Sequence, residues 1–345
     1  MSRTAQQETP IPRTVLYAEG QPVDDAIEGK VFGSDIRVMR REVGALAELA
    51  AADCADIAGL MISRLNVSAA DMDRFPKLRV ILRMGVGYDR VARDAAAERQ
   101  IIVCNVPDYG TTEVADHALA LVLALRRGII QHHDAQRRTP PPIWRPIPGA
   151  LVRRASVQRF GILGLGRIGT AAALRARAFG FRVLFYDPYL PNGAELALGI
   201  ERAATLEDLL RQSDVLSIHT PLTRETRSML GLAQLRQMPR DAVIVNTARG
   251  PIIDIDALEV VLREGHLAGA GLDVVPVEPP VEPLPALLQA YRAREPWLEG
   301  RLVVTPHAAY YSPESQVDTR VKSAETMRAA LLTNRPRNVI TPDMD

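Results

Sequence analysis

Three glycines follow a short apolar run, FGIL: Gly164, Gly166 and Gly169, the last of which lies at the start of a stretch of helical character, RIGTAAALRARAF. The spacing G-x-G-x-x-G between a strand and a helix is typical of a turn that holds a dinucleotide pyrophosphate at the helix N-terminus. The first glycine permits the tight turn, the second lets backbone approach the phosphates, and the third lets helix and strand pack closely. The motif therefore predicts a parallel α/β sheet that binds a dinucleotide, although an ordinary glycine-rich turn would have the same spacing.

The next apolar run, RVLFYD, ends in Asp187. An acidic side chain at about this distance after the glycines binds the ribose diol of NAD. No Lys or Arg follows in DPYLPNG, so a 2′-phosphate would meet a carboxylate, which favours NAD over NADP. Alternatively, Asp187 serves only to form the turn before Pro188.

Apolar runs alternate with helical stretches along the chain, which predicts two consecutive doubly wound α/β units. In the first unit we expect strands at 15–18, 35–39, 55–63, 79–85 and 101–106. In the second we expect strands in FGILG, RVLFYD, DVLSIHT, AVIVNTA, GAGLDVV and LVVTPH. One long buried helix is expected over 111–129, capped by Thr111 or Thr112, and a capped amphipathic helix in SPESQVDTRVKSAETMRAALLTN. Between 136 and 154 the chain is too proline-rich for regular structure and too apolar for a free linker, so we expect an arm that packs on another surface.

Composition excludes several classes of function. The 42 Lys and Arg residues nearly balance the 41 Asp and Glu residues, which leaves no overall positive charge for nucleic acid or an anionic membrane. No apolar run is long enough to span a bilayer, and the first residues lack the apolar core of a secretion signal. Two cysteines, Cys54 and Cys104, are too few for a disulfide framework and lack metal-ligand spacing. We therefore expect a cytoplasmic protein without a metal site.

Polar side chains follow three successive strands of the second unit. Arg249 follows AVIVNTA, Asp273 and Glu278 follow GAGL, and His307 follows LVVTP. Ligands of open α/β sheets bind at these strand ends. A His can exchange a proton near neutral pH, a carboxylate beside it stabilises the imidazolium, and a guanidinium binds a carboxylate in a planar fork. Together they point to hydride transfer on a 2-oxo or 2-hydroxy acid, although each residue alone could be an ordinary strand-end or loop residue.

The segments NTARG, GLDV, EPP and TPHAA, with RMGVGYDRVARDAAAERQIIVCNVP and EVADHALAL, resemble the D-isomer-specific 2-hydroxyacid dehydrogenases over nearly the whole chain. ALRARAFGFRVLFYDPYLPNG and TPHAAYYS are most similar to the C-terminal binding protein branch. The resemblance implies a Rossmann NAD-binding domain at 112–308 inserted into a flavodoxin-like substrate domain, formed by 1–111 and the C-terminal helix in 309–345. It also implies that the helix and arm at 112–155 mediate a homodimer.

The resemblance assigns roles to particular residues. It implies that His307 is the acid/base, Glu278 its partner and Arg249 a substrate-binding cation. The substrate would also meet the carboxylate-binding loop and a residue near the catalytic His: Arg83, Gly85, Val86, Gly87 and Tyr310. Residues matching positions that touch NAD are Val114, Gly164, Gly166, Arg167, Ile168, Gly169, Asp187, His219, Thr220, Pro221, Thr226, Thr247, Ala248, Arg249, Asp273 and His307.

Two departures from the branch concern the substrate. Tyr310 stands where that branch has a Trp three residues after the catalytic His, which changes pocket size and hydrogen bonding. The segment 281–300 is longer than expected and is predicted to contain a helix. Trp144 in the arm is expected at an interface, over the substrate or in a core.

Three functions fit these observations. The first is an NAD-dependent enzyme that interconverts a small 2-oxo acid and its D-2-hydroxy acid. The second is an NAD(H)-gated oligomeric protein that docks peptide partners, with catalysis incidental. The third, oxidation of another anion such as phosphite, would need a Lys near Arg83, and RMGVGYD contains none.

Overall fold

The computed structural model describes residues 13–19, 26–138, 140, 144–333 and 335–344. The N-terminal segment 1–12 and the tip of the proline-rich arm, 139 and 141–143, lie outside the described residues. The chain divides into two compact units, one made of Met1–Tyr109 with Ser312–Asp345 and the other of Gly110–Tyr311.

The first unit contains a five-stranded parallel sheet in the order β2-β1-β3-β4-β5. Its strands are β1 (Arg13–Tyr17), β2 (Ile36–Arg40), β3 (Ile57–Ile62), β4 (Val80–Arg83) and β5 (Ile102–Asn105). The central strand β3 is buried at every position, as expected for a strand with both faces covered. This order is that of the flavodoxin-like doubly wound sheets.

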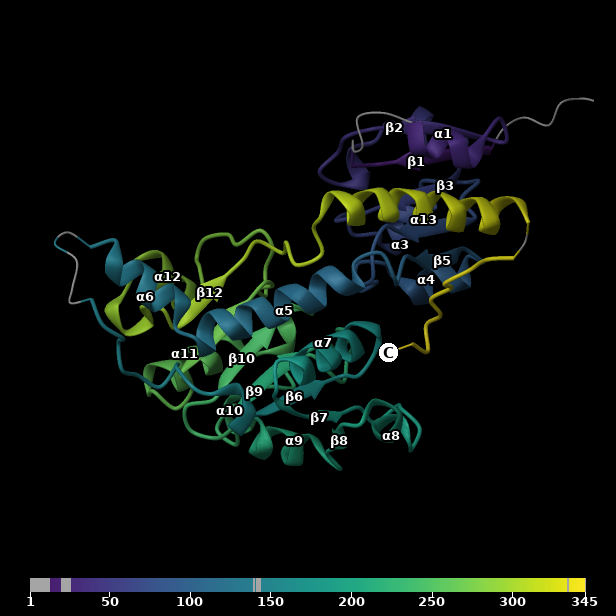
Figure 1. Cartoon of the computed structure of the whole chain (residues 1–345). Coiled ribbons are helices and arrows are strands. Elements are labelled where there is room, and N and C mark those ends of the chain that lie inside the picture. Colours follow the sequence, from purple (N-terminus) through teal and green to yellow (C-terminus); the bar gives the residue numbers. More distant parts are fainter. Residues whose placement is uncertain (1–12, 20–25, 139, 141–143, 334, 345) are drawn as a thin grey trace, which may run out of the picture. The chain divides into compact units, whose positions relative to one another are not determined.

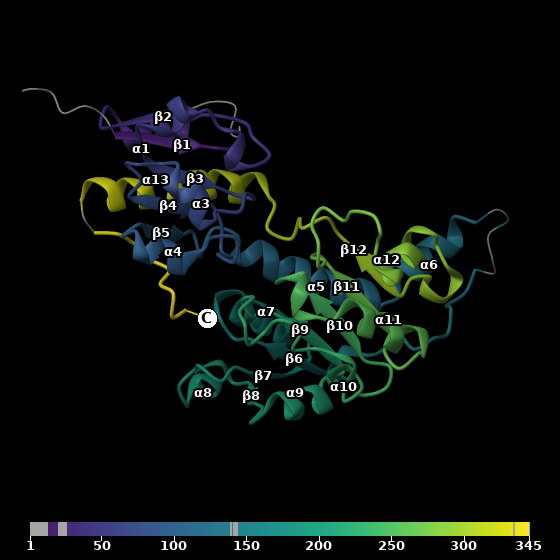
Figure 2. The same cartoon turned by 180° about the vertical axis from the view of Figure 1, so that it is seen from behind.

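Alternate strand residues of this sheet enter two separate cores, one on each face. The first core receives Phe32 of α1 (Ala26–Phe32) and Met327 of α13 (Pro313–Leu332). The opposite core receives Cys54, Met72 and Ala96. These three belong to α2 (Ala51–Cys54), α3 (Ala69–Asp73) and α4 (Arg93–Glu98), and the 3-10 turn η1 (Leu46–Glu48) packs there as well. Within this unit, α13 runs along the sheet although it comes from the end of the chain (Figures 1 and 2).

A buried ion cluster ties α13 to the start of the chain. Glu28 of α1 is fully buried and accepts hydrogen bonds from Arg320 Nε at 2.9 Å and Nη2 at 2.7 Å. The Tyr17 hydroxyl donates to the same carboxylate at 3.2 Å, and the Arg40 guanidinium lies 4.6 Å from the centre of the Tyr17 ring. Burial and the neighbouring Glu28 carboxylate raise the pKa of Tyr17 far above its usual value. The C-terminal helix is therefore held by paired charges as well as by apolar packing.

The second unit contains a seven-stranded parallel sheet in the order β12-β11-β10-β9-β6-β7-β8, the Rossmann order with one added edge strand. Its strands are β6 (Arg159–Leu163), β7 (Arg182–Tyr186), β8 (Glu201–Arg202), β9 (Val215–Ile218), β10 (Val243–Asn246), β11 (Gly269–Leu272) and β12 (Leu302–Val304). All the pairings between neighbouring strands are parallel. Two doubly wound parallel sheets were predicted, and this is confirmed.

Helices cover both faces of this second sheet (Figure 1). One core lies under α5 (Thr111–Arg126) and α7 (Arg167–Ala178). The other lies under α9 (Leu206–Gln212), α10 (Leu232–Leu235), α11 (Ile255–Arg263) and α12 (Ala286–Arg292). The remaining elements are α6 (Ile129–Gln136), α8 (Ala194–Leu198), η2 (Ala155–Val157), η3 (Gly250–Ile252) and η4 (Pro296–Leu298). The helix α12 confirms that the segment 281–300 contains a helix.

The helix expected over 111–129 is shorter than predicted. Its N-cap residue is Gly110, and neither Thr111 nor Thr112 caps it. The helix ends at Arg126 because Gly128 adopts the left-handed conformation, with φ of +60°, before α6 begins. Arg126 is almost fully buried and its guanidinium donates to the Asp241 carbonyl at 2.9 Å, while burial lowers its pKa to about 10. The predicted helix was too long because apolar residues continue in the sequence past Gly128, where the helix is interrupted.

Candidate active site

The predicted glycine loop connects β6 to α7. Gly164 has φ of +87°, which favours glycine, and a Cβ there would lie 3.0 Å from the Thr220 backbone nitrogen. A Cβ on Gly169 would lie 2.1 Å from the Gly164 carbonyl oxygen, so the helix approaches the turn too closely for any side chain. Nothing lies within 4 Å of a Cβ on Gly166, and no side chain caps the helix that begins after it. The loop therefore presents open backbone at a helix N-terminus, as pyrophosphate binding requires.

Asp187 follows β7 and contacts the glycine loop directly. Its Oδ2 accepts a hydrogen bond from the Leu165 backbone at 2.9 Å, and its Oδ1 accepts one from the Tyr189 backbone at 3.0 Å. The side chain therefore forms a turn across Pro188 and also lies beside the glycine loop. Arg202 on the neighbouring strand β8 pairs with Glu195 at 2.9 Å, so its charge already has a carboxylate partner.

Polar residues predicted to contact NAD also follow β9 and β10. His219 Nε2 lies 2.8 Å from Ser217 Oγ, and burial lowers the pKa of His219 to about 4. Thr226 Oγ1 donates to the Pro221 carbonyl at 2.7 Å and so shapes its own loop. Within the described part of the chain, the buried hydroxyl oxygens of two threonines have no hydrogen-bond partner: Thr220 and Thr247.

Unpartnered buried hydroxyl groups are costly and usually mark a place where water or a ligand binds. Here they belong to Thr220, whose backbone nitrogen lies close to Gly164, and to Thr247, which directly follows β10. The open loop, the carboxylate of Asp187 and these two hydroxyls fit a dinucleotide. The remaining predicted NAD contacts lie in the same unit: Val114 in the first turn of α5, Arg167 and Ile168 in the first turn of α7, and Ala248 after β10.

His307 and Glu278 form a close pair at the ends of two adjacent strands. His307 Nδ1 lies 2.6 Å from Glu278 Oε2, and Glu278 Oε1 accepts a hydrogen bond from the Val275 backbone at 3.0 Å. Burial opposes ionisation of Glu278, but the His307 hydrogen bond and charge, the Val275 amide and the charge of Arg249 together hold its pKa below the ordinary value. This carboxylate is therefore ionised at neutral pH.

Arg249 follows β10, the next strand of the sheet. Its Nη1 donates to the Ala248 carbonyl at 2.8 Å, and the Asn246 side chain donates to the Arg249 carbonyl at 2.8 Å. The loop after β10 packs closely on the loop after β11. A Cβ on Gly250 would lie only 2.0 Å from the Val275 carbonyl carbon, so this approach requires glycine. That close approach brings the Arg249 segment beside the Glu278 segment.

Asp273 and Tyr310 lie in the same unit as this pair. The Tyr310 ring meets the His307 ring edge-to-face, with centres 6.1 Å apart. Asp273 is almost fully buried, and its carboxylate binds the chain that follows β12. A further residue, His117 of α5, joins this hydrogen-bond network through Thr305. Sequence reasoning missed His117, and the available signal was an imidazole within the Ala- and Leu-rich run ADHALAL.

The predicted carboxylate-binding loop belongs to the first unit. Arg83 ends β4, and Gly85 has φ of +151°. A Cβ on Gly85 would lie 1.5 Å from Arg83 Nη1, so the guanidinium folds over a backbone that has no side chain. The carbonyl of Val86 is held by the Asn105 side chain at 2.7 Å, which orders the loop that continues to Gly87.

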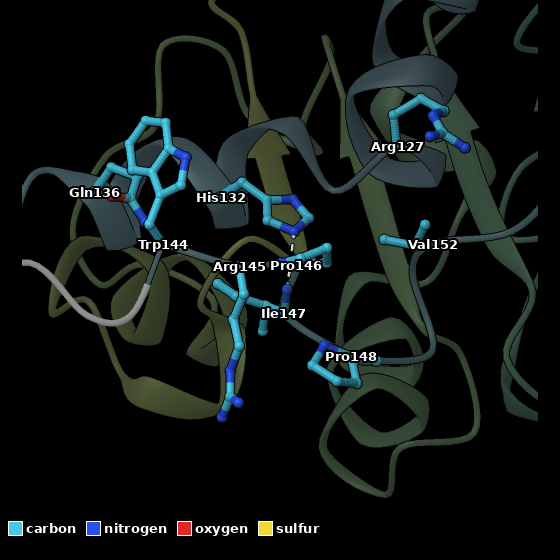
Figure 3. A pocket seen from close by; sticks show the side chains of 10 residues that line it. Arg127, His132, Gln136, Trp144, Arg145, Pro146, Ile147, Pro148 and Val152 are labelled. Atoms are coloured by element: carbon cyan, nitrogen blue, oxygen red, sulfur yellow. Dashed lines mark hydrogen bonds between the residues drawn. The ribbon is translucent and has the colours of Figure 1, made fainter.

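A pocket of about 660 Å³ lies between α6 and the arm (Figure 3). His132 bridges the two segments, with Nδ1 2.7 Å from the Gly128 carbonyl and Nε2 3.1 Å from the Ile147 backbone nitrogen. Trp144 lines the pocket but remains 89% exposed, so it is not a core residue of this chain. The pocket includes none of the predicted site residues.

Neither a membrane-spanning helix nor a metal-binding cluster occurs in the described part of the chain. Among the described residues, no helix is long and apolar enough to cross a membrane. The same residues contain no group of three or more His, Cys, Asp and Glu side chains arranged to hold a metal ion.

Fold and site together define a dinucleotide-dependent oxidoreductase with a histidine–carboxylate pair. Residues 119–309 match the family described as D-isomer specific 2-hydroxyacid dehydrogenase, NAD binding domain. The chain is 37% identical to a glyoxylate reductase of Korarchaeum cryptofilum over 85% of this chain and 84% of that protein. It is 34% identical to C-terminal-binding protein 1 of Caenorhabditis elegans over 82% of this chain, but that match spans only 38% of the longer protein.

A solved structure extends the likeness over both units. It is a NADPH-dependent glyoxylate/hydroxypyruvate reductase of Sinorhizobium meliloti, in complex with NADP and malonate, with 28% identity and a TM-score of 0.82. The match covers 96% of this chain and 97% of that one. The chain belongs to the D-isomer specific 2-hydroxyacid dehydrogenase family, as the sequence predicted, and it is an NAD-dependent dehydrogenase.

Proposed function

We propose that this enzyme reduces a small 2-oxo acid to its D-2-hydroxy acid, reversibly, with NADH. The observation that carries this proposal is the 2.6 Å contact between His307 Nδ1 and Glu278 Oε2, at the strand ends of the sheet that bears the glycine loop. The names of two relatives, both glyoxylate reductases, support a compact substrate such as glyoxylate or hydroxypyruvate.

Each residue of the site has a role in this reaction. When bound, NADH supplies the hydride for the carbonyl carbon. His307 gives a proton from Nε2 to the carbonyl oxygen, and takes it back in the reverse direction. Glu278 accepts the hydrogen bond from Nδ1, which orients the ring and stabilises its protonated form. Arg249 binds the substrate carboxylate with its planar guanidinium.

We assign NAD binding to the second unit. The glycine loop would hold the pyrophosphate and Asp187 the ribose diol, whereas a 2′-phosphate would be repelled by that carboxylate. The hydroxyls of Thr220 and Thr247 would gain the partners that they lack. The other NAD contacts predicted from the sequence remain part of this proposal.

On the substrate side, we assign a second carboxylate-binding cation to Arg83. Its loop lies at the carboxyl end of β4, the edge at which open α/β sheets bind ligands. The backbone of Gly85, Val86 and Gly87 would add hydrogen-bond donors. Tyr310, whose ring meets that of His307, would set the size of the substrate.

The test is NADH oxidation with glyoxylate, hydroxypyruvate, pyruvate and phenylpyruvate. His307→Ala should abolish turnover while NADH still binds, as measured by fluorescence titration. Glu207→Gln, a change of an exposed residue of α9, is the control and should keep full activity. Turnover retained in His307→Ala would refute the assignment.

We also propose that the enzyme is a homodimer formed through α5, α6, the arm and α7. Large apolar side chains are exposed along these elements: Ile129, Trp144, Leu174 and Phe179. Large apolar side chains exposed on one set of elements are what an interaction surface would present. Sedimentation should give twice the chain mass, and Phe179→Glu with Leu174→Glu should give the monomer. A wild-type monomer would refute this part.

An NAD(H)-gated interaction protein is the second candidate, because of the 34% identity to C-terminal-binding protein 1. NAD-dependent capture of a peptide partner, with negligible turnover on every oxo acid, would favour it over the enzyme. A cytoplasmic location remains our expectation and rests on the two buried free cysteines, Cys54 and Cys104.

A further inference from the structure

The loop that carries His307 has a conformation that other groups must hold. His307 has φ of +51°, a left-handed backbone that a non-glycine residue adopts only when its surroundings enforce it. Its backbone nitrogen donates to the Asp273 carbonyl at 2.8 Å and to the Thr305 carbonyl at 3.0 Å. These two contacts fix one peptide group, and the two N–H groups that follow it are bound by a side chain.

The Asp273 carboxylate supplies most of that support. Its Oδ1 accepts the Ala308 N–H at 2.9 Å, and its Oδ2 accepts the Ala309 N–H at 3.0 Å. Successive backbone N–H groups that converge in this way form a nest for an anion. The side chain of Asp273 is only 1% exposed, so water cannot replace it. The loop after His307 is therefore wrapped around a buried negative charge.

Two more residues hold that carboxylate in place. Thr305 Oγ1 lies 2.6 Å from Asp273 Oδ1, and His117 Nε2 lies 3.0 Å from Thr305 Oγ1. A carboxylate only accepts, so the single hydroxyl hydrogen of Thr305 points to Asp273. The hydroxyl oxygen must then accept from His117, whose Nε2 carries a hydrogen. The chain of hydrogen bonds runs from His117 on α5, through Thr305, to the nest.

We propose that Thr305 and His117 are positioning residues for His307. They orient the Asp273 carboxylate, the carboxylate shapes the loop, and the loop keeps His307 Nδ1 on Glu278 with Nε2 directed to the substrate. Neither residue touches the reacting atoms in this scheme. The inference rests on the proposed function for its catalytic consequence, but the hydrogen-bond chain is a property of the unliganded protein.

The decisive comparison is Thr305→Val against Thr305→Ser. Valine keeps the shape but removes the hydroxyl, so Asp273 Oδ1 keeps the Ala308 N–H but loses its hydroxyl donor, and His117 Nε2 loses its acceptor. Because small misplacements of a reacting group are costly, kcat should fall between about tenfold and a hundredfold. The KM for the oxo acid should stay within about twofold of wild type. Serine, which restores the hydroxyl, should recover most of the lost kcat.

His117→Phe tests the outer end of the chain, and Glu207→Gln on the exposed surface of α9 is its control. The first should lower kcat less than Thr305→Val does, and the second should have no effect. The positioning role is refuted if Thr305→Val leaves kcat unchanged. It is also refuted if Thr305→Val lowers kcat, NADH affinity and the melting temperature together, and Thr305→Ser does not restore kcat.

Amide hydrogen exchange of the peptide covering 305–309 gives a readout that needs no turnover. Exchange at Ala308 and Ala309 should be faster in Thr305→Val than in wild type, and should return to the wild-type rate in Thr305→Ser. Unchanged exchange would refute the structural part of the proposal. If wild type reduces no oxo acid, the proposed function fails, and the exchange rates still decide whether this chain of hydrogen bonds holds the loop.

Discussion

Glu278 Oε2 lies 2.6 Å from His307 Nδ1, although the two residues follow different strands, β11 and β12. The second carboxylate oxygen is held by the Val275 backbone, so the acceptor has one orientation. This fixed pairing leaves only Nε2 of the imidazole for proton exchange with a substrate. The charge of Arg249 helps to keep Glu278 ionised, and thereby links the third residue of the site to the pair.

Glu278→Gln should lower kcat for reduction of an oxo acid. The amide is close in size to the carboxylate but carries no charge, so His307 Nδ1 loses its charged acceptor and the ring loses its fixed orientation. Because a misplaced reacting group is costly, kcat should fall by about tenfold or more, whereas the Kd for NADH should stay close to wild type. Steady-state rates and fluorescence titration measure the two quantities. A wild-type kcat would show that Glu278 does not position His307.

Gly169→Ala and Gly166→Ala should separate folding from binding. A Cβ at Gly169 collides with the Gly164 carbonyl, so the melting temperature of the unliganded protein should fall. A Cβ at Gly166 meets no atom within 4 Å, so Gly166→Ala should have the melting temperature of wild type. It should bind NADH at least tenfold more weakly, because the added methyl group would occupy the position of the phosphates. Calorimetry and fluorescence titration give the two quantities. Wild-type NADH affinity in Gly166→Ala would contradict the assignment of the loop.

Asp187→Asn should weaken discrimination between the two dinucleotides. Removing the charge abolishes repulsion of a 2′-phosphate and weakens binding of the ribose diol, so the ratio of the Kd for NADPH to the Kd for NADH should fall by about tenfold or more. Asp208→Asn changes a charge elsewhere in the same unit and should leave the ratio unchanged. A constant ratio in Asp187→Asn would mean that other residues select NAD.

His219 should make the unliganded protein less stable in acid. Burial lowers its pKa from 6.5 to about 4 in the folded state. Between these values the unfolded chain takes up a proton that the folded chain refuses, so stability falls as the pH decreases from about 6.5 towards 4. His219→Gln should lose less unfolding free energy than wild type between pH 7 and 5.5 in urea titrations, whereas His133→Gln should match wild type. Equal losses of unfolding free energy in wild type, His219→Gln and His133→Gln would show that His219 does not cause the loss of stability in acid.

Glu28→Gln should destabilise the first unit. The substitution leaves Arg320 and Arg40 without their buried counter-charge, and breaking a buried pair in this way costs roughly 3 kcal/mol or more. Tyr17→Phe removes only one hydrogen bond and should cost less. Denaturant unfolding followed by fluorescence gives both values. A neutral Glu28→Gln would show that apolar packing alone anchors α13.

Local patterns were enough to predict most of the fold. Buried parallel strands are apolar throughout, so β3 and β10 could be recognised from a few residues each, and the glycines and capped C-terminal helix are equally local. The end of α5 was misplaced because apolar residues continue past Gly128, and periodicity does not report the break. The two-residue strand β8 is too short to leave a pattern.

By itself, the sequence determined two parallel sheets, a glycine loop after β6, and an arginine, a glutamate and a histidine after neighbouring strands. Only the tertiary structure decided that Glu278 meets His307 at Nδ1, and that Asp273 is buried in a nest tied to His117. The physical reason is distance along the chain. Thr305 is 32 residues from Asp273 and 188 from His117, and no periodic pattern carries information across such separations until the sheet brings the strand ends together.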